Sequence, residues 1–213
     1  MPFELIVVDL DNTLYAADCG VFAHMDERMT AFVSRELGVD EARANELRID
    51  YWRRYGTTLR GLILHHGTEP EGFLHEVHDI AVHEMLQPDA SLDEALSALT
   101  GRKVIHTNGT REHAGRVLAA LGIERHFSTI YDIRFNAYMP KPCSTTLGFL
   151  LEAEGVSAAK ALVIDDMEDN LAAARDIGAR TALVSAKEPR EPWDFHAASF
   201  PELCRQILQA EVR

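Results

Sequence analysis

Four short apolar runs, spaced along the chain, restrict the folds open to this sequence. Residues 5–8 are uninterrupted and rich in β-branched residues, and the same pattern recurs at residues 103–106, 161–164 and 181–184. Such runs are typical of strands that are buried on both faces of a parallel sheet. Helical periods lie between them at residues 111–121, 145–154 and 170–177, each followed at once by a glycine. Strand alternating with helix predicts a Rossmann-like, doubly wound α/β core.

The segment from residue 16 to residue 87 breaks this alternation. It contains no comparable apolar run, and its periodicity predicts helices over residues 25–36, 41–55 and 71–84. Ligands of open α/β sheets bind beyond the carboxyl ends of the strands, so a module inserted directly after the first strand is expected to cover that site. We therefore expect a core made of residues 1–15 and 88–213, with an α-helical cap at 16–87. Residues 187–194 are predicted as a surface loop and 200–212 as a terminal helix.

The composition is that of a folded globular protein with an acidic surface. Among 213 residues, 46% are apolar and 26% are charged, which is near the globular average. The formal net charge of −13 repels polyanions. We therefore expect no nucleic-acid polymer and no membrane among the partners, and either a monomer or a homodimer.

Cysteine usage and the amino terminus both favour a cytoplasmic protein. Cys19, Cys143 and Cys204 are few, odd in number and far apart, which fits neither a disulfide framework nor a metal cluster. The terminal MPFELIVVDLD has a short apolar run broken by Asp9, and it lacks the basic region of a signal peptide. No stretch approaches the roughly 20 apolar residues of a membrane span.

Polar clusters follow the predicted strands, where parallel strands share one edge of the sheet. Taken singly, each has an ordinary explanation, because strand-end Asp residues cap helices, Thr-Asn-Gly forms turns and Lys is solvated. Their occurrence at one edge favours a functional site. The residues concerned are Asp9 and Asp11 in DLDNTLY, Thr107 and Asn108 in HTNGT, Lys141 in MPKP, and Asp165 and Asp166 in VIDDMEDN.

This ordered set, a DxDxT motif followed by Thr, Lys and an acidic pair, resembles the haloacid dehalogenase superfamily of phosphotransferases over nearly the whole chain. The resemblance implies catalysis through an aspartyl-phosphate intermediate. Magnesium is the implied cofactor, held by Asp9, Asp165 and Asp166 and by the backbone carbonyl of Asp11. Mg²⁺ prefers hard oxygen ligands and phosphate oxygens, and its charge makes an acidic site accept an anion.

The same resemblance implies the reaction steps. Asp9 is the expected nucleophile, and Asp11 is expected to protonate the leaving alkoxide and then to activate water. The neighbouring charge of Asp9 is expected to raise the pKa of Asp11.

Phosphoryl oxygens are expected to bind at two further motifs. The hydroxyl group of Thr107 and the backbone of Asn108 and Gly109 form one, and the ammonium group of Lys141 supplies a fixed positive charge from the other. Thr107 and Lys141 therefore count as both catalytic and substrate-binding.

Asp11 also separates reactions within the superfamily. A dehalogenase has no leaving oxygen to protonate and typically lacks this carboxylate, so Asp11 favours hydrolysis of phosphate esters. A phosphomutase keeps it, and sugar-phosphate or phosphoglycolate phosphatases are further alternatives. Met167 stands where relatives often have Ser, and Asp169 and Asn170 are expected to orient Lys141 or the water molecules on the metal.

The cap segment YWRRYGTTLRGLILHHG, residues 51–67, resembles the pyrimidine 5′-nucleotidase branch of the superfamily. The resemblance implies that nucleoside 5′-monophosphates are the substrates. Aromatic rings at Tyr51, Trp52 and Tyr55 would stack on a base, and Arg60 or Arg53 would meet a base carbonyl or the phosphate. In the alternative interpretation, Tyr51 and Tyr55 pack on one helix face as i and i+4 neighbours.

The histidines give weaker signals. Five of them crowd the cap and favour a solvated helix face over a metal site; they are His65, His66, His75, His78 and His83. His106, His113 and Arg111 flank the Thr-Asn-Gly turn, where each would lie near the substrate or behind it.

Two alternatives to an enzyme use the same residues. A phospho-acceptor signalling module, like a response-regulator receiver, also combines acidic residues, Mg²⁺, Thr and Lys on a doubly wound sheet. It would be shorter, lack a helical insertion, and carry its acceptor on a later strand. A scaffold that keeps the fold without the chemistry would not need every carboxylate of the motifs.

Overall fold

A six-stranded parallel sheet forms the centre of the molecule. The computed structural model describes residues 3–211. The strand order is β3-β2-β1-β4-β5-β6, and every neighbouring pair is parallel. The strands are β1 (Leu5–Val8), β2 (Arg102–His106), β3 (Thr129–Tyr131), β4 (Ala161–Asp165), β5 (Arg180–Val184) and β6 (Phe195–Ala197).

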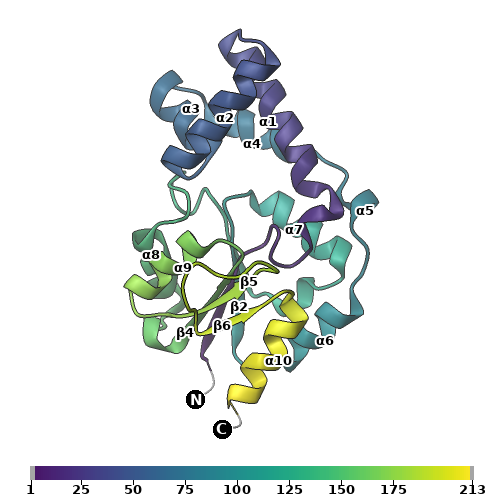
Figure 1. The fold of residues 1–213 in the computed structure, drawn as a ribbon, viewed down its shortest axis with the longest axis vertical. Helices are drawn as coiled ribbons and strands as arrows, with labels where there is room; N and C mark the ends of the chain where they lie inside the picture. Colours follow the sequence, from purple (N-terminus) through teal and green to yellow (C-terminus); the bar gives the residue numbers. More distant parts are fainter. Residues whose placement is uncertain (1–2, 212–213) are drawn as a thin grey trace.

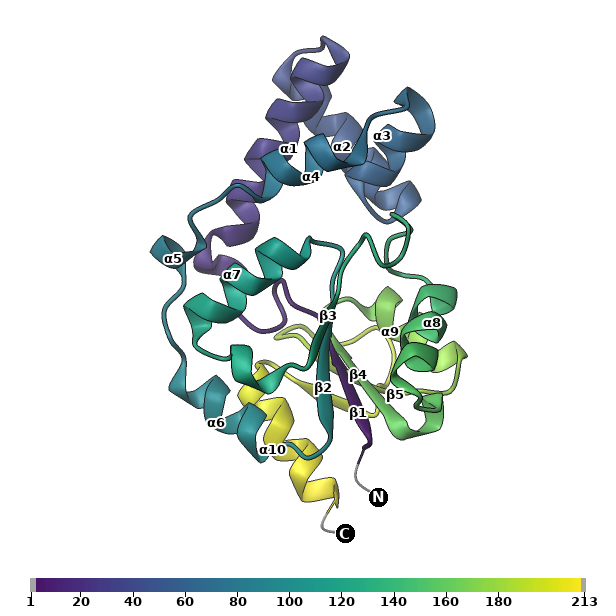
Figure 2. The ribbon, with the colours of Figure 1, turned by 180° about the vertical axis from the view of Figure 1, so that it is seen from behind.

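Both faces of the sheet are covered by helices (Figures 1 and 2). Along β1, Ile6 and Val8 belong to one apolar cluster and Leu5 and Val7 to another, as expected when side chains alternate across a strand. Helices α8 (Ser144–Glu154) and α9 (Glu168–Asp176) lie on one side of the sheet; α6 (Ala90–Ala98), α7 (Arg111–Leu121) and α10 (Phe200–Glu211) lie on the other. The predicted doubly wound α/β core is confirmed.

Four helices stand together beyond the sheet, on the side where β1 ends (Figure 1). They are α1 (Val21–Leu37), α2 (Glu41–Tyr55), α3 (Thr58–His66) and α4 (Pro70–His78). The inserted helical cap is therefore present. Its boundary at residues 16–87 stays a prediction, and the short helix α5 (Val82–Met85) lies beside α7 of the core.

Local capping signals set the ends of the cap helices. Asp40 and Thr57 accept hydrogen bonds from backbone N–H groups in the first turns of α2 and α3. At the end of α2, Gly56 has a φ of 85°. A Cβ atom there would lie 2.9 Å from the carbonyl oxygen of Lys141, so glycine is required where the cap meets this loop of the core.

The predicted helix at 71–84 is wrong, because the chain is interrupted at residues 79–81. The amide of Ile80 donates to the carbonyl of His78 at 2.9 Å, and the amide of Val82 donates to the carbonyl of Ile80 at 3.0 Å. These are two successive inverse γ-turns, and they turn the chain from the cap towards the core. Ile80 is buried in the turn.

Several short elements were not predicted. They are the edge strands β3 and β6, the helices α3 and α6, and the 3₁₀ turns Ala17–Cys19, Glu124–His126 and Ala158–Lys160. The first cap helix begins earlier than predicted, at Val21. The predicted last residue of the terminal helix, Val212, lies outside the described residues.

Within residues 3–211, no helix combines the length and the apolar character needed to cross a membrane. All three cysteines are free thiols.

Candidate active site

Three carboxylates meet where β1 and β4 end side by side. Val8 pairs with Ile164 in the sheet register, and the amide of Asp9 donates to the carbonyl of Ile164 at 2.9 Å. Asp9, Asp165 and Asp166 each offer one oxygen, and these oxygens lie within 4.8 Å of one another. Parallel pairing has thus brought together two motifs that are distant in the sequence.

The side chain of Lys141 joins two of these carboxylates. Its Nζ atom lies 2.6 Å from Oδ1 of Asp9 and 2.8 Å from Oδ2 of Asp165, and all three residues are buried. Burial alone would lower the pKa of Lys141, but the two carboxylates outweigh it and raise the pKa. Lys141 is therefore a permanent ammonium group in this cluster.

The cluster still carries more negative than positive charge. Burial raises the pKa of Asp9 and of Asp166 above the ordinary value, and the charge of Asp165 adds to both shifts. One ammonium group cannot neutralise three carboxylates, so their full ionisation requires a further cation. Closely spaced hard oxygens fit Mg²⁺.

Asp11 lies apart from this cluster and is held by two other residues. Its Oδ1 atom accepts a hydrogen bond from the hydroxyl group of Tyr15 at 2.5 Å and lies 2.8 Å from Nε2 of His113. Burial alone would raise the pKa of Asp11, but the electrostatic pull of His113 and the hydrogen bonds from His113 and Tyr15 lower it. The expectation that Asp9 raises this pKa was wrong, because Asp11 has its own donors.

The Thr-Asn-Gly turn lies beside the cluster. Thr107 is buried, and its Oγ1 atom accepts a hydrogen bond from the amide of Gly109 at 2.9 Å. A Cβ atom on Gly109 would lie 3.2 Å from that oxygen and 3.3 Å from Nε2 of His78. A side chain at position 109 would therefore crowd Thr107 and His78, which favours glycine in this turn.

Asn108 has a function that the sequence did not indicate. Its Oδ1 atom accepts from the amide of Lys141 at 2.8 Å, and its Nδ2 atom donates to the carbonyl of Lys141 at 3.2 Å. Substrate binding was predicted for the backbone of Asn108, and its side chain has the separate role of fixing the backbone that carries Lys141.

Asp165 is also fixed from a second direction. Its Oδ1 atom accepts hydrogen bonds from Nδ2 of Asn170 at 2.8 Å and from the amide of Met167 at 2.9 Å. Asn170 thus orients a carboxylate rather than Lys141. Asp169 points to the surface, where it pairs with Arg190 at 2.6 Å, so its predicted contact with the site is wrong.

A cavity of about 500 Å³ extends from this site into the cap. The core contributes the residues around the catalytic motifs, and the cap walls of the cavity come from α1, α2, the start of α3, and α4. Of the predicted cap residues, Trp52 and Arg53 line it. Tyr51, Tyr55 and Arg60 are not among its lining residues.

Tyr51 and Tyr55 contribute to an aromatic cluster between α2 and α3 instead. The hydroxyl group of Tyr51 lies 2.7 Å from Nε2 of His66, and that of Tyr55 lies 2.6 Å from Nε2 of His65. The rings of Tyr51 and His65 are stacked with their centroids 5.5 Å apart. These contacts match the alternative interpretation, in which the two tyrosines pack on one helix face.

The remaining histidines divide by burial. His75 and His83 are exposed, whereas His78 is buried with its ring 4.9 Å from that of His113. A solvated face is therefore wrong for His78. Burial lowers the pKa of His78 to about 4 and that of His106 to about 3.

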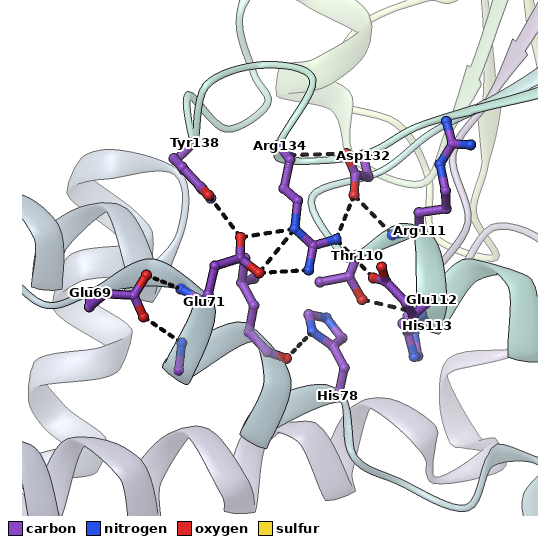
Figure 3. Close-up of polar contacts among 12 residues, drawn as sticks. Glu69, Glu71, His78, Thr110, Arg111, Glu112, His113, Asp132, Arg134 and Tyr138 are labelled. Atoms are coloured by element: carbon purple, nitrogen blue, oxygen red, sulfur yellow. Dashed lines mark hydrogen bonds and ion pairs between the residues drawn. The ribbon is translucent and has the colours of Figure 1, made fainter.

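A network of charged groups joins the cap to the core next to the cavity (Figure 3). Arg134 lies 2.8 Å from Oε2 of Glu71 on α4 and also pairs with Asp132 and Glu112 of the core. The hydroxyl group of Tyr138 donates to Oε1 of Glu71 at 2.8 Å. No sequence motif marks these residues, because the contact depends on how α4 is placed over the core.

Arg111 lies on the core side of the same region. Its amide donates to Oδ2 of Asp132 at 3.0 Å, and its Nη2 atom donates to the carbonyl of Ile130 at 2.9 Å. It is an exposed residue that holds the end of β3.

Solved structures resemble this fold over almost its whole length. The Bacillus subtilis HAD-hydrolase YfnB, bound to magnesium, matches with a TM-score of 0.66 and 15% identity over 98% of this chain and 100% of that chain. A HAD phosphatase from Thermococcus onnurineus matches with a TM-score of 0.63 and 18% identity over 96% and 97%. L-2-haloacid dehalogenase from Xanthobacter autotrophicus matches with a TM-score of 0.63 and 17% identity over 97% and 98%.

Sequence comparison gives the family. A curated relative, phosphate metabolism protein 8 of Saccharomyces cerevisiae, is 29% identical over 190 residues, which is 82% of this chain and 59% of the relative. The chain thus spans about three fifths of the relative's length. The profile of haloacid dehalogenase-like hydrolases matches residues 3–178. The chain belongs to the haloacid dehalogenase-like hydrolase family and is an enzyme of that family.

Proposed function

We propose that this enzyme is a magnesium-dependent phosphomonoester hydrolase that acts through an aspartyl-phosphate intermediate. The observation that carries this proposal is the buried cluster of Asp9, Asp165 and Asp166 around Lys141, with Asp11 held separately beside it. A phosphate ester needs an in-line nucleophile, a positive environment for its oxygens and an acid for the leaving group. The cluster and its neighbours offer each of these.

Asp9 is the proposed nucleophile. Its Oδ1 atom faces Lys141, and its Oδ2 atom accepts a hydrogen bond from Oγ1 of Thr13 at 2.8 Å. With both oxygens held, the carboxylate has a fixed orientation for attack. A bond forms between an Asp9 oxygen and phosphorus, and the bond from phosphorus to the ester oxygen breaks. Thr107 and Lys141 bind the phosphoryl oxygens during this step.

Asp11 is the proposed acid and base. The dianionic phosphoryl group beside it would raise its pKa, so that it carries the proton that the leaving alkoxide takes. In the second step the Asp11 carboxylate accepts a proton from water, which attacks phosphorus and releases Asp9 and phosphate. His113 and Tyr15 keep this carboxylate in position through both steps.

Asp9, Asp165 and Asp166 would hold the magnesium ion, together with the backbone carbonyl of Asp11. When bound, the ion offsets the charge of the carboxylates and of the phosphoryl oxygens. Lys141 and Asn170 orient two of these carboxylates in the protein itself, so the site is prepared for the ion.

Nucleoside 5′-monophosphates are the proposed substrates. The cavity of about 500 Å³ is in the range of sites for small organic ligands. It joins the catalytic motifs to an aromatic side chain, Trp52, and a cationic one, Arg53. Asp11 favours a phosphate ester over a halogenated acid, which has no leaving oxygen to protonate.

A substrate panel tests this proposal. Purified enzyme is assayed with p-nitrophenyl phosphate, nucleoside 5′-monophosphates, phosphoglycolate, glycerol phosphate and 2-chloropropionate, with Mg²⁺ or with EDTA. We expect Mg²⁺-dependent release of phosphate, fastest from nucleotides, and no release of chloride. Chloride release without phosphatase activity would contradict the reaction class, and equal rates on all phosphate esters would contradict the nucleotide assignment. A single stable acyl phosphate without turnover would favour a signalling module.

A further inference from the structure

We propose that Asp26 and Arg48 form the specificity element of the cap, and that together they bind the hydrogen-bonding edge of a nucleobase. This inference rests on the proposed function. It assigns two residues outside the sequence motifs to the part of the substrate that lies farthest from the reacting phosphoryl group.

Both residues line the cavity that contains the catalytic carboxylates. Asp26 comes from α1 and Arg48 from α2, so they reach the cavity from two adjacent helices. The surrounding wall of the cap is mainly apolar; it includes Phe22, Met25, Met29, Ile49, Phe73 and Leu74. A planar ring therefore has apolar surface to lie against, with one polar pair beside it.

The pair is held in place by other residues of the cap. Nη1 of Arg48 lies 2.7 Å from Oδ1 of Asp26. Nε of Arg48 donates to Oγ1 of Thr30 at 2.9 Å and to Oδ1 of Asn45 at 3.0 Å. The side chain of Arg48 is 16% exposed, which leaves little room for other rotamers. A guanidinium group fixed in this way is prepared for binding, since little of its conformational freedom remains to be lost.

Hydrogen-bonding capacity remains on both partners. Within residues 3–211, the hydrogen bonds of this pair use Nε and Nη1 of Arg48 and Oδ1 of Asp26. Nη2 of Arg48 is left as a donor and Oδ2 of Asp26 as an acceptor. A donor next to an acceptor is complementary to the edge of a nucleobase, which presents a carbonyl or ring nitrogen beside an N–H group. Ribose, glycerol and glycolate have no such planar edge.

A purely structural role explains this pair less well. The Asp26 side chain is 35% exposed, but that of Arg48 is largely buried, and burying a guanidinium group has a desolvation penalty that can exceed the attraction within the pair. The pair between Asp50 and Arg54 on α2 provides a contrast. It has a similar length of 2.8 Å, but its side chains are 42% and 66% exposed and neither residue lines the cavity. That pair serves as the matched control.

The test compares substrates that differ only in the base. We would measure kcat and KM for UMP, CMP, AMP and ribose 5-phosphate with Mg²⁺, in the wild type, Asp26→Asn, Arg48→Gln and Arg48→Lys. The wild type should prefer its best nucleotide over ribose 5-phosphate by at least about tenfold in kcat/KM, as one well-placed polar pair supplies. Each variant should reduce that preference at least about fivefold, mainly by raising the KM for nucleotides.

The control variants are Asp50→Asn and Arg54→Gln, which should keep the wild-type preference. Arg48→Lys retains the positive charge next to Asp26 but loses the planar donors. If Arg48→Gln is unstable, Arg48→Lys still shows whether the planar donors are needed for the nucleotide preference. An unchanged preference for nucleotides over ribose 5-phosphate in all three cavity variants would overturn the inference. The proposed function would still stand if these variants hydrolyse p-nitrophenyl phosphate. No hydrolysis of any monophosphate by the wild type would overturn the proposed function, and this inference with it.

Discussion

Sequence motifs predicted substrate-binding residues both at the catalytic edge of the sheet and in the cap, but the cap tyrosines do not have the arrangement expected. At the sheet edge, Lys141 lies within hydrogen-bonding distance of both Asp9 and Asp165. In the cap, Tyr51 and Tyr55 were expected at the substrate, but the cavity is lined by their neighbours Trp52 and Arg53. The place of a residue at a strand end follows from the register of the sheet. The direction in which a helix residue points depends on how that helix packs, which the sequence pattern alone does not give.

The largest effect is expected at the sheet edge, for Asp9→Asn. The amide is a poor nucleophile and a poor ligand for a cation, so kcat/KM for p-nitrophenyl phosphate should fall by at least about a thousandfold. Asp169→Asn is the matched control, because it makes the same change from Asp to Asn at a residue that pairs with Arg190 on the surface. It should stay within about twofold of wild type. Comparable losses of activity in both variants would contradict a specific role for Asp9.

The next effect concerns His78, which joins the cap to the core. Its neutral form is favoured in the folded protein, where its pKa is about 4, whereas the unfolded chain takes up a proton near the ordinary value of 6.5. Unfolding free energy should therefore fall as the pH drops from 6.5 to 4, by up to about 3 kcal/mol from this residue.

Urea denaturation at several pH values measures this contribution. His78→Gln should show a shallower loss of stability than the wild type over the same pH interval. His83→Gln, at an exposed position of α5, should keep the wild-type slope. Identical slopes for the wild type and His78→Gln would mean that the buried imidazole does not titrate as proposed.

A smaller effect distinguishes the two sides of α2. Trp52 is 48% exposed and lines the cavity, so Trp52→Ala should raise the KM for nucleotides about tenfold through lost contact with the base. Tyr55→Phe removes a hydroxyl group that bonds His65 away from the cavity, and it should leave KM unchanged. The reverse result would restore the tyrosines as the stacking residues.

The smallest effect is expected at the contact between α4 and the core. Hydrogen bonds from Arg134 and Tyr138 lower the pKa of Glu71 to about 2. The Glu71 side chain is 44% exposed, so Glu71→Gln should lower the unfolding free energy by less than about 1 kcal/mol. It should still speed hydrogen exchange of the α4 amides. In the wild type, ionised Glu71 contributes this unfolding free energy above pH 4.5, and the contribution is lost as the pH falls towards 2.

Glu76→Gln is the control for that exchange experiment. Glu76 pairs with Arg35 inside the cap and does not reach the core. If both variants speed exchange in α4 equally, the contact with Arg134 does not hold the cap against the core.

Most of the core could be predicted because buried parallel strands have a simple signal. Uninterrupted runs such as residues 161–164 indicate a strand, and a strand that ends in polar residues indicates the site edge. The edge strand β6 has no such signal, since Phe195 and His196 are only half-buried. The break between α4 and α5 was missed because neither Gly nor Pro marks residues 79–81.

Side-chain contacts within the site were harder to predict than its location. Tyr15 and His113 hold Asp11, but neither the DLDNTLY motif that contains Tyr15 nor the distant position of His113 in the sequence predicts these contacts. Asn108 was recognised as a motif residue, yet its side chain binds the backbone of Lys141. Such contacts depend on how the loops settle around one another, which local patterns do not determine.

The central claim is that Asp9 carries the phosphoryl group during turnover. Enzyme mixed with Mg²⁺ and excess p-nitrophenyl phosphate would be quenched with acid and reduced with borohydride, which converts an acyl phosphate into homoserine. Peptide mass spectrometry then locates the modified residue. The account predicts homoserine at position 9 and at none of the positions 11, 165 and 166. Homoserine at position 11, or steady turnover with position 9 unmodified, would contradict it.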